Sequence, residues 1–282
     1  MTTDQHAGNV DAVDYESDWQ RWHKERDAAL ASPHGFLAVT ALHFLNAEPT
    51  RFPVVPGVWV SDARGLRVEI APDETLELDG QPLVGEHDFG IIAERDGVTV
   101  SSGDLEIEVA KRGGFDILRP RDPANPRRTS FRRTPAYPAD PAWVLDGFFS
   151  PFVEPRPTTV GAAVEGLEHV YDAVGEVTFV HRGRDLRLVA FPGHTEQQLQ
   201  VLFTDETAGV TTHPAVRSLV LDVTDAGGAV RLDFNRAVNL PCAYTPYATC
   251  PLAPLENRLP IAVTAGELDP SLDEARIEQL AG

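Results

Sequence analysis

The pattern of apolar and polar positions along this chain begins with a helical period. Between Asp14 and Ala31 the apolar residues fall on one stripe and the charged residues lie largely elsewhere. The stripe consists of Tyr15, Trp19, Trp22, Ala29 and Leu30. Asp14 or Ser17 can cap the start of this helix, and Ser32-Pro33 followed by Gly35 ends it. The two tryptophans predict a helix that packs on a sheet or barrel, with a partner-binding helix as the alternative.

After Gly35 the pattern changes to the two-residue period of β-strands. The apolar segment 36–45 fits a short helix or a buried strand, whereas 105–109 alternates cleanly and ends at Arg112-Gly113-Gly114. Further strands are expected at 58–60, 66–70, 75–78, 98–100, 177–181, 186–191, 199–203, 219–223, 230–234 and 259–263. We therefore expect a mainly β fold, an antiparallel barrel or sandwich with one N-terminal amphipathic helix.

The expected organisation is a single β-rich domain. Residues 1–13 are predicted to form a flexible leader, 14–269 the domain, and 270–282 a short C-terminal helix or tail. Two proline-rich stretches, 120–141 and 151–157, either join two packed β halves near 120–157 or form long surface connections.

The net charge of the chain limits the kinds of binding partner that we expect. The chain carries 24 Lys+Arg against 43 Asp+Glu, a formal net charge of −19. Such a surface repels phosphate backbones and anionic lipid, so neither nucleic acid nor membrane is an expected partner. The densest basic cluster comprises Arg119, Arg121, Arg127, Arg128, Arg132 and Arg133. Interspersed aspartates favour a solvated, salt-bridged face there over an anion site.

The remaining bulk features favour a cytoplasmic protein. No apolar run reaches the roughly 18 residues that a membrane span needs, and residues 1–18 are polar and acidic, unlike a signal peptide. Two cysteines are too few for the disulfide framework of a small secreted fold.

The segment from Asp233 to Glu267 carries an unusual set of short motifs. It contains Asp-Phe-Asn, Cys-Ala-Tyr, Cys-Pro, Glu-Asn and Ala-Gly-Glu in that order. This series resembles the signature of a bacterial family, domain of unknown function 1684. Weaker similarities are Gly35-Phe36-Leu37 with Leu42-His43-Phe44-Leu45, and Arg121-Asp122-Pro123. The resemblance implies related folds and no established reaction.

One stretch departs from the family pattern. Where the family usually has Tyr-Gly-x-Gly-Arg, this chain has His213-Pro214-Ala215-Val216-Arg217. The arginine is kept and both glycines are lost, which would change the activity if those glycines shape a ligand-contacting loop.

Prolines stiffen the 233–267 segment by fixing φ, and stiff loops on β scaffolds commonly carry binding groups. The candidate ligand-binding residues are His43, Arg217, Asn235, Asn239, Cys242, Tyr244, Tyr247, Glu256 and Asn257. Structural roles are the equal alternative, since Asn side chains satisfy turns and buried Cys packs as a small apolar group.

The cysteines admit three kinds of chemistry. A Cys242–Cys250 disulfide would close a short loop, but a reducing cytosol disfavours it. A metal site is not expected, because no Cys-x-x-Cys is present and no His lies nearby in sequence. A thiol nucleophile would need a base such as His43 or His213 brought close by the fold. A structural cysteine is the preferred interpretation.

The preferred function is the binding of a small organic molecule in a pocket walled by residues 233–267. The alternatives are a hydrolase-type enzyme that uses Glu256, His43 or Cys242, and a structural or interaction protein. Nucleophile elbows, zinc-protease motifs and nucleotide-binding loops are missing from the sequence, and we predict no cofactor. The oligomeric state is left open.

Overall fold

The computed structural model describes residues 12–223 and 227–281. Helix α1 (Ala12–Leu30) precedes the sheets, and α2 (Pro126–Thr129) and α3 (Glu274–Ala281) come later. The predicted amphipathic helix is therefore present. The leader predicted for residues 1–13 lies outside the described residues up to position 11, and its last two residues belong to α1.

The strands form two groups along the chain. The first group comprises β1 (His43–Phe44), β2 (Thr50–Phe52), β3 (Val55–Asp62), β4 (Gly65–Ile70), β5 (Glu77–Leu78), β6 (Gln81–Pro82), β7 (Gly85–Gly90), β8 (Gly97–Ser102), β9 (Leu105–Arg112) and β10 (Phe115–Arg121). The second comprises β11 (Val144–Gly161), β12 (Glu168–His181), β13 (Arg184–Pro192), β14 (Gln198–Phe203), β15 (Arg217–Asp222), β16 (Gly228–Asp233) and β17 (Val238–Asn239).

The first group makes two antiparallel sheets, in the orders β1-β10-β9-β8-β5-β6 and β2-β3-β4-β7. The period-2 segment at 105–109 forms most of β9, whose Ile107 and Val109 are fully buried between the sheets. Trp59 on β3 is also fully buried, and its ring stacks on Phe89. These side chains belong to one hydrophobic core between the two sheets.

The second group makes one strongly bent antiparallel sheet in the order β16-β11-β12-β13-β14-β15-β17. The meander expected at 177–203 is present as β12, β13 and β14, and Arg182-Gly183 makes its first turn. This sheet encloses a second core around Phe203 and Phe234, whose rings meet edge to face.

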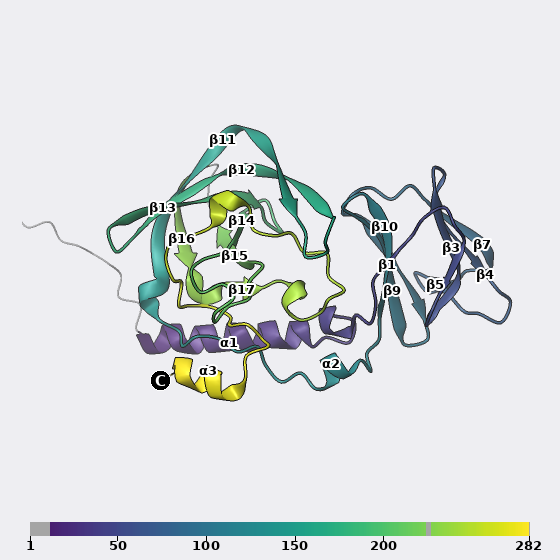
Figure 1. The fold of residues 1–282 in the computed structure, drawn as a ribbon, viewed down its shortest axis with the longest axis horizontal. Coiled ribbons are helices and arrows are strands. Elements are labelled where there is room, and N and C mark those ends of the chain that lie inside the picture. The colour runs from purple at the N-terminus through teal and green to yellow at the C-terminus, as the bar shows by residue number, and fades with distance from the viewer. Residues whose placement is uncertain (1–11, 224–226, 282) are drawn as a thin grey trace, which may run out of the picture.

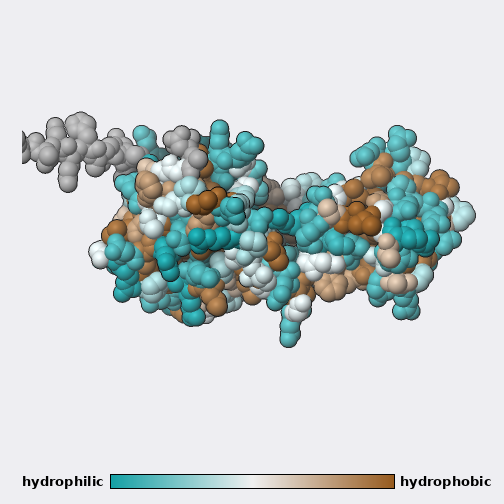
Figure 2. Space-filling model, turned by 90° about the horizontal axis from the view of Figure 1, so that it is seen from above, coloured by the Kyte–Doolittle hydropathy of each residue, from teal (hydrophilic) through white to brown (hydrophobic). Residues whose placement is uncertain are grey.

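The two groups give the molecule an elongated outline with two lobes (Figure 1). Strands β1–β10 occupy the first lobe and β11–β17 the second lobe. Helix α1 runs along the second lobe. Seen from above, the molecule narrows between the lobes (Figure 2). Each group has its own hydrophobic core. The division into two halves stays a prediction, and the two cores support a boundary between β10 and β11.

Helix α1 is attached to the second group by specific hydrogen bonds. The Tyr15 hydroxyl donates to Asp233 at 2.7 Å, and the Trp19 indole donates to the Asn235 carbonyl at 2.8 Å. Asp27 at the other end of the helix accepts from the Thr134 amide at 2.9 Å. The aromatic stripe thus packs on the β lobe through the segment that contains the sequence motifs.

The predicted fold class is confirmed, since the chain is mainly β with antiparallel sheets and an N-terminal helix. The sheets are packed as in a sandwich, and none of those in the described residues closes into a barrel. The strand expected at 259–263 is wrong, because this segment is irregular. Leu259 and Val263 nevertheless fill the second core, which explains their apolar character.

The proline-rich stretch 151–157 is also not a connection. It lies inside β11, where the pairing with β12 shifts register between Pro151 and Arg156. A β-bulge accommodates prolines because it relieves the strand of ladder hydrogen bonds there.

Candidate functional site

The motif segment folds into short 3-10 turns that follow β16. Asp233 ends β16 and caps the turn 234–236, its carboxylate accepting from the Asn235 amide at 3.2 Å. A second turn spans 241–243 with Pro241 at its start, after the two residues of β17. The prolines therefore stiffen this segment of the chain, which crosses the end of the second lobe.

The Ala-Gly-Glu motif places the carboxylate of Glu267 against this segment. Glu267 is 1% exposed, accepts from the Asn239 amide at 2.6 Å and from the Tyr244 hydroxyl at 3.1 Å, and lies 3.4 Å from Arg26 Nε of α1. Burial raises the pKa of this carboxyl. Gly266 has φ +80°, and a Cβ there would lie 2.6 Å from the Ala237 carbonyl, so the turn requires glycine.

Four of the predicted site residues are buried and bonded within the protein. Asn235 bridges to the backbone of Asp140, and Asn239 donates to the Leu268 carbonyl at 2.7 Å. Asn257 accepts from the Val189 amide and donates to the carbonyls of Val189 and Leu202. Arg217, 1% exposed, pairs with Asp205 at 2.7 Å and donates to the carbonyls of Val263 and Ala265.

The other predicted residues are placed differently. Tyr244 bonds to Glu267 and Thr134 beneath α1, and Tyr247 is half-buried in the same loop. Glu256 is exposed. His43 belongs to β1 in the first lobe, where it stacks on Phe52 and burial lowers its pKa. The fold therefore does not bring Glu256 or His43 together with the remaining candidates.

A cavity of about 660 Å³ lies where the two lobes meet, and we call it the interlobe cleft. One wall comes from the motif segment, with Leu240, Pro241, Ala248, Thr249, Cys250 and Pro251. Strands β12 to β14 and the connection between β13 and β14 add Tyr171, Asp172, Phe191, Pro192, Gly193, His194, Gln200 and Leu202. The opposite wall comes from the first lobe, with Phe36, Arg95, Glu108, Arg112 and Arg119.

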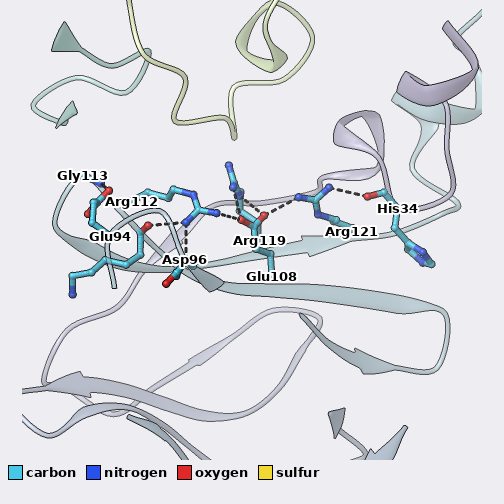
Figure 3. A network of polar contacts seen from close by, with 9 residues as sticks. His34, Glu94, Asp96, Glu108, Arg112, Gly113, Arg119 and Arg121 are labelled. Atoms are coloured by element: carbon cyan, nitrogen blue, oxygen red, sulfur yellow. Dashed lines mark hydrogen bonds and ion pairs between the residues drawn. The ribbon is translucent and has the colours of Figure 1, made fainter. Parts of the chain in front are cut away.

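The first-lobe wall is organised around one carboxylate. Glu108 on β9 accepts from Arg112 at 2.7 Å, from Arg119 at 2.9 and 2.7 Å, and from Arg121 at 2.7 Å. Arg121 also donates to the His34 carbonyl, which ties the wall to the segment after α1. Figure 3 shows Glu108 between these guanidinium groups, with a loop of the second lobe descending towards them. Three arginines share one carboxylate, so the wall keeps excess positive charge.

Burial would by itself raise the pKa of Glu108, but hydrogen bonds and charge from Arg119 and Arg121 lower it to about 2. The side chains of Glu108 and Arg119 are 13% and 5% exposed. The carboxylate therefore stays ionised, and its arginines are fixed in place.

A further arginine joins the two lobes across the cleft. The guanidinium of Arg95, from the turn before β8, lies 5.0 Å from the ring centroid of Tyr171 on β12. Arg95 is exposed and has φ 71°. Burial raises the pKa of the Tyr171 hydroxyl, which therefore remains neutral as a hydrogen-bond donor.

Cys242 has the most reactive surroundings among the candidates. Its pKa is lowered by a hydrogen bond with the Cys250 thiol and, against the effect of burial, by His213. Of the bases that could serve Cys242, the fold supplies His213 and leaves His43 in the other lobe. Within the described residues, no group of three or more His, Cys, Asp or Glu side chains is arranged to hold a metal ion.

The lobe that contains the sequence motifs matches a known protein family. The model of the family described as protein of unknown function (DUF1684) matches residues 129–268. We refer to residues 129–268, which carry this match, as the DUF1684 domain. The match begins after β10 and ends after Glu267, so the DUF1684 domain contains β11–β17. Helix α1 lies outside it, and so does the first-lobe wall around Glu108, which we call the arginine wall after Arg112, Arg119 and Arg121.

Among solved structures, the chain is similar to the solution NMR structure of an uncharacterized protein from Haloarcula marismortui. The two are 28% identical, the similarity covers 50% of this chain and 78% of that one, and the TM-score is 0.43. No curated protein matches the chain. No helix in the described residues is both long and apolar enough to cross a membrane.

Most residues of the arginine wall carry no distinguishing signal in the sequence. Arg119 and Arg121 were expected on a salt-bridged face, whereas Arg95, Glu108 and Arg112, and Tyr171 on the opposite side of the cleft, had no special signal. They are separated by up to 76 positions in the chain and meet through strand pairing and lobe contact. The alternation of Glu106 and Glu108 with apolar residues indicates which face of β9 is polar, but not what that face meets.

Proposed function

We propose that the protein binds a small organic anion in the interlobe cleft, between the DUF1684 domain and the arginine wall. The observation that carries the proposal is the sharing of Glu108 by Arg112, Arg119 and Arg121, with Arg95 also lining the cleft. On a chain with net charge −19, such a local excess of positive charge favours an anionic ligand. Guanidinium groups match carboxylate and phosphate oxygens in two-pronged geometry.

The other walls of the cleft fit an organic group. Phe36, Phe191, Leu202 and Leu240 offer apolar surface, and His194, Gln200 and Thr249 offer polar contacts beside it. A volume of about 660 Å³ lies in the range of small-molecule sites. The expected ligand therefore combines an acidic group with an apolar body, and a nucleic acid is disfavoured by the overall charge.

A purely structural salt-bridge network is the competing explanation for the same contacts. It would hold β9 and β10 together without any ligand. The two explanations differ at Arg95, which faces the cleft and contacts Tyr171 without a share in Glu108. Removing its charge should affect ligand binding while leaving the network intact.

The test is thermal denaturation with inorganic phosphate, citrate and 4-hydroxybenzoate, each compared with sodium chloride at equal ionic strength. At about 100 times its Kd, a bound anion stabilises the fold by about 2.7 kcal/mol, which raises Tm by several degrees. Arg95→Gln should weaken binding by about tenfold to a hundredfold, the worth of one charge-assisted hydrogen bond.

Arg187→Gln is the matched control, because Arg187 is exposed on β13 and lies outside the cleft. It should bind as the unaltered protein does. An equal loss of stabilisation in both variants, or no anion effect beyond that of chloride, would contradict the proposal.

A further inference from the structure

The two cysteines of the chain are in contact at the edge of the motif segment. Cys242 lies in the 3-10 turn 241–243, and its amide donates to the Cys250 sulfur at 3.3 Å. Both are free thiols. Cys242 is half-buried and Cys250 is 8% exposed, so the two cysteines differ in their access to solvent.

A histidine and an aspartate extend this pair into a row. His213, from the loop before β15, lies near Cys242 and lowers the pKa of its thiol. His213 Nδ1 lies 3.9 Å from Asp269 Oδ2, with both side chains less than one-fifth exposed. The other Asp269 oxygen accepts from the Ser271 amide at 2.9 Å and from its hydroxyl at 2.7 Å. The carboxylate is thereby held beside the imidazole.

We propose that Cys242 and Cys250 form a reversible dithiol–disulfide site that hydroperoxides oxidise. Cys242 is the attacking thiol, His213 takes its proton, and Cys250 is the resolving thiol. The arrangement matches what such chemistry needs: a partly exposed thiol beside a base, with a second thiol in reach. The inference does not depend on anion binding in the cleft.

The reaction balances in two steps. The Cys242 thiolate attacks one oxygen of the hydroperoxide, the O–O bond breaks, and an S–O bond forms to give a sulfenic acid. The leaving alkoxide or hydroxide takes up the proton that His213 received from the thiol. The Cys250 sulfur then attacks the sulfenic sulfur, an S–S bond forms, and water leaves. Two thiols and one hydroperoxide become one disulfide, one alcohol or water, and one water.

Two further observations support this assignment. The contacts with Cys250 and His213 lower the pKa of Cys242, whereas the pKa of Cys250 is raised by its hydrogen bond to Cys242 and by burial. The pair is thus asymmetric, as attacking and resolving thiols are. In a reducing compartment such a disulfide would be transient, which is the usual behaviour of redox-responsive cysteines.

Oxidation of Cys242 and Cys250 to a disulfide would also change the wall of the interlobe cleft. Cys250 lines that cavity, whereas Cys242 faces His213. Drawing Cys250 into a disulfide would pull on the cleft wall formed by Ala248, Thr249 and Pro251.

The experiment is oxidation of the reduced full-length chain with one equivalent of hydrogen peroxide, followed by thiol titration and peptide mass spectrometry. The expected product has lost both free thiols and two hydrogens, with Cys242 and Cys250 linked within one chain. Cys250→Ser should instead accumulate a sulfenic acid at Cys242 that dimedone traps. In Cys242→Ser, Cys250 should stay reduced over the same time.

His213→Gln provides the test of the base. It keeps both thiols, and at neutral pH it should slow oxidation by about tenfold as the thiolate fraction falls. The difference should vanish at alkaline pH, where both proteins carry thiolate, a result that a merely structural His213 would not give. Oxidation of Cys250 in Cys242→Ser at the unaltered rate, or over-oxidation of Cys242 in the unaltered protein without any intramolecular disulfide, would overturn the proposal.

Discussion

Individual polar side chains of the motif segment serve mainly to hold backbone in place. Asn235, Asn239 and Asn257 are at most 1% exposed and are bonded to main-chain groups from distant parts of the chain. Irregular segments in a core leave amides and carbonyls without ladder partners, and a buried asparagine supplies both a donor and an acceptor. An unusual polar motif thus has a structural explanation at these three positions, even though its neighbours line the cleft.

Asn257→Ala should destabilise the protein by about 2–4 kcal/mol, because it leaves backbone groups of Val189 and Leu202 buried without partners. The neighbouring Glu256→Ala is the control, since an exposed side chain should change the free energy of unfolding by about 0.5 kcal/mol or less. Urea denaturation of both variants measures the difference. Equal stabilities would show that Asn257 is not a structural link.

Some residue roles were accessible from sequence and others were not. The arginine kept from the family pattern, Arg217, is a candidate ligand-binding residue by sequence, and in the structure it pairs with Asp205 inside the core. Its partner was not foreseen, since Asp205 lies in a loop with no distinguishing pattern. His43 and His213 are the two histidines that the sequence offers as a base for Cys242, and His213 is the one that lowers the pKa of this thiol. Asp269 carried no signal beyond its residue type.

At the level of elements, β9 and β10 show how a hairpin becomes a binding wall. The pair is in antiparallel register with Arg119 opposite Glu108, so one carboxylate reaches the guanidinium groups of Arg119 and Arg121. Arg112, four residues after Glu108, joins from the end of β9. The wall is therefore built into the strand pairing and does not depend on a mobile loop.

The free energy of unfolding at acid pH should depend on Glu108 in the arginine wall. The pKa of Glu108 is lowered from 4.5 to about 2 in the fold, so its contribution is complete above about pH 4.5 and is lost as the pH falls towards 2. The shift corresponds to roughly 3 kcal/mol at neutral pH. Glu108→Gln should be less stable above pH 4.5 and should lose less stability below it.

Glu168→Gln is the control for that measurement, as Glu168 is exposed at the start of β12. Its urea-denaturation profile against pH should run parallel to that of the unaltered protein. A parallel profile for Glu108→Gln as well would show that Glu108 contributes no pH-dependent stability.

Element prediction succeeded where local pattern decides structure. The amphipathic stripe gave α1, and alternation with glycine turns gave β9 and the β12–β14 meander. Strand β11 was missed because its prolines signal a connection, and β10 because the run from Phe115 to Arg121 contains Pro120. The segment 259–263 was apolar for another reason, as it fills a core from an irregular path.

At the scale of the whole molecule, the two β lobes have separate hydrophobic cores. The molecule narrows where the lobes meet (Figure 2), and the interlobe cleft lies there. The DUF1684 domain supplies one wall and the first lobe the other. Lobe contacts join residues far apart in the chain, such as Arg95 and Tyr171, and a single sequence contains no signal for them. A pocket walled by the motif segment was predicted, whereas an arginine-rich opposite wall was not.

The most direct test of anion binding is an NMR titration with inorganic phosphate, following the arginine Nε–H signals at constant ionic strength. If the cleft binds phosphate, the signals of Arg95, Arg112 and Arg119 should shift saturably with a common Kd, while the signal of Arg187 stays in place. Shifts of similar size at Arg187, growing without saturation, would mean that phosphate only screens the surface charge. The cleft would then be no anion site.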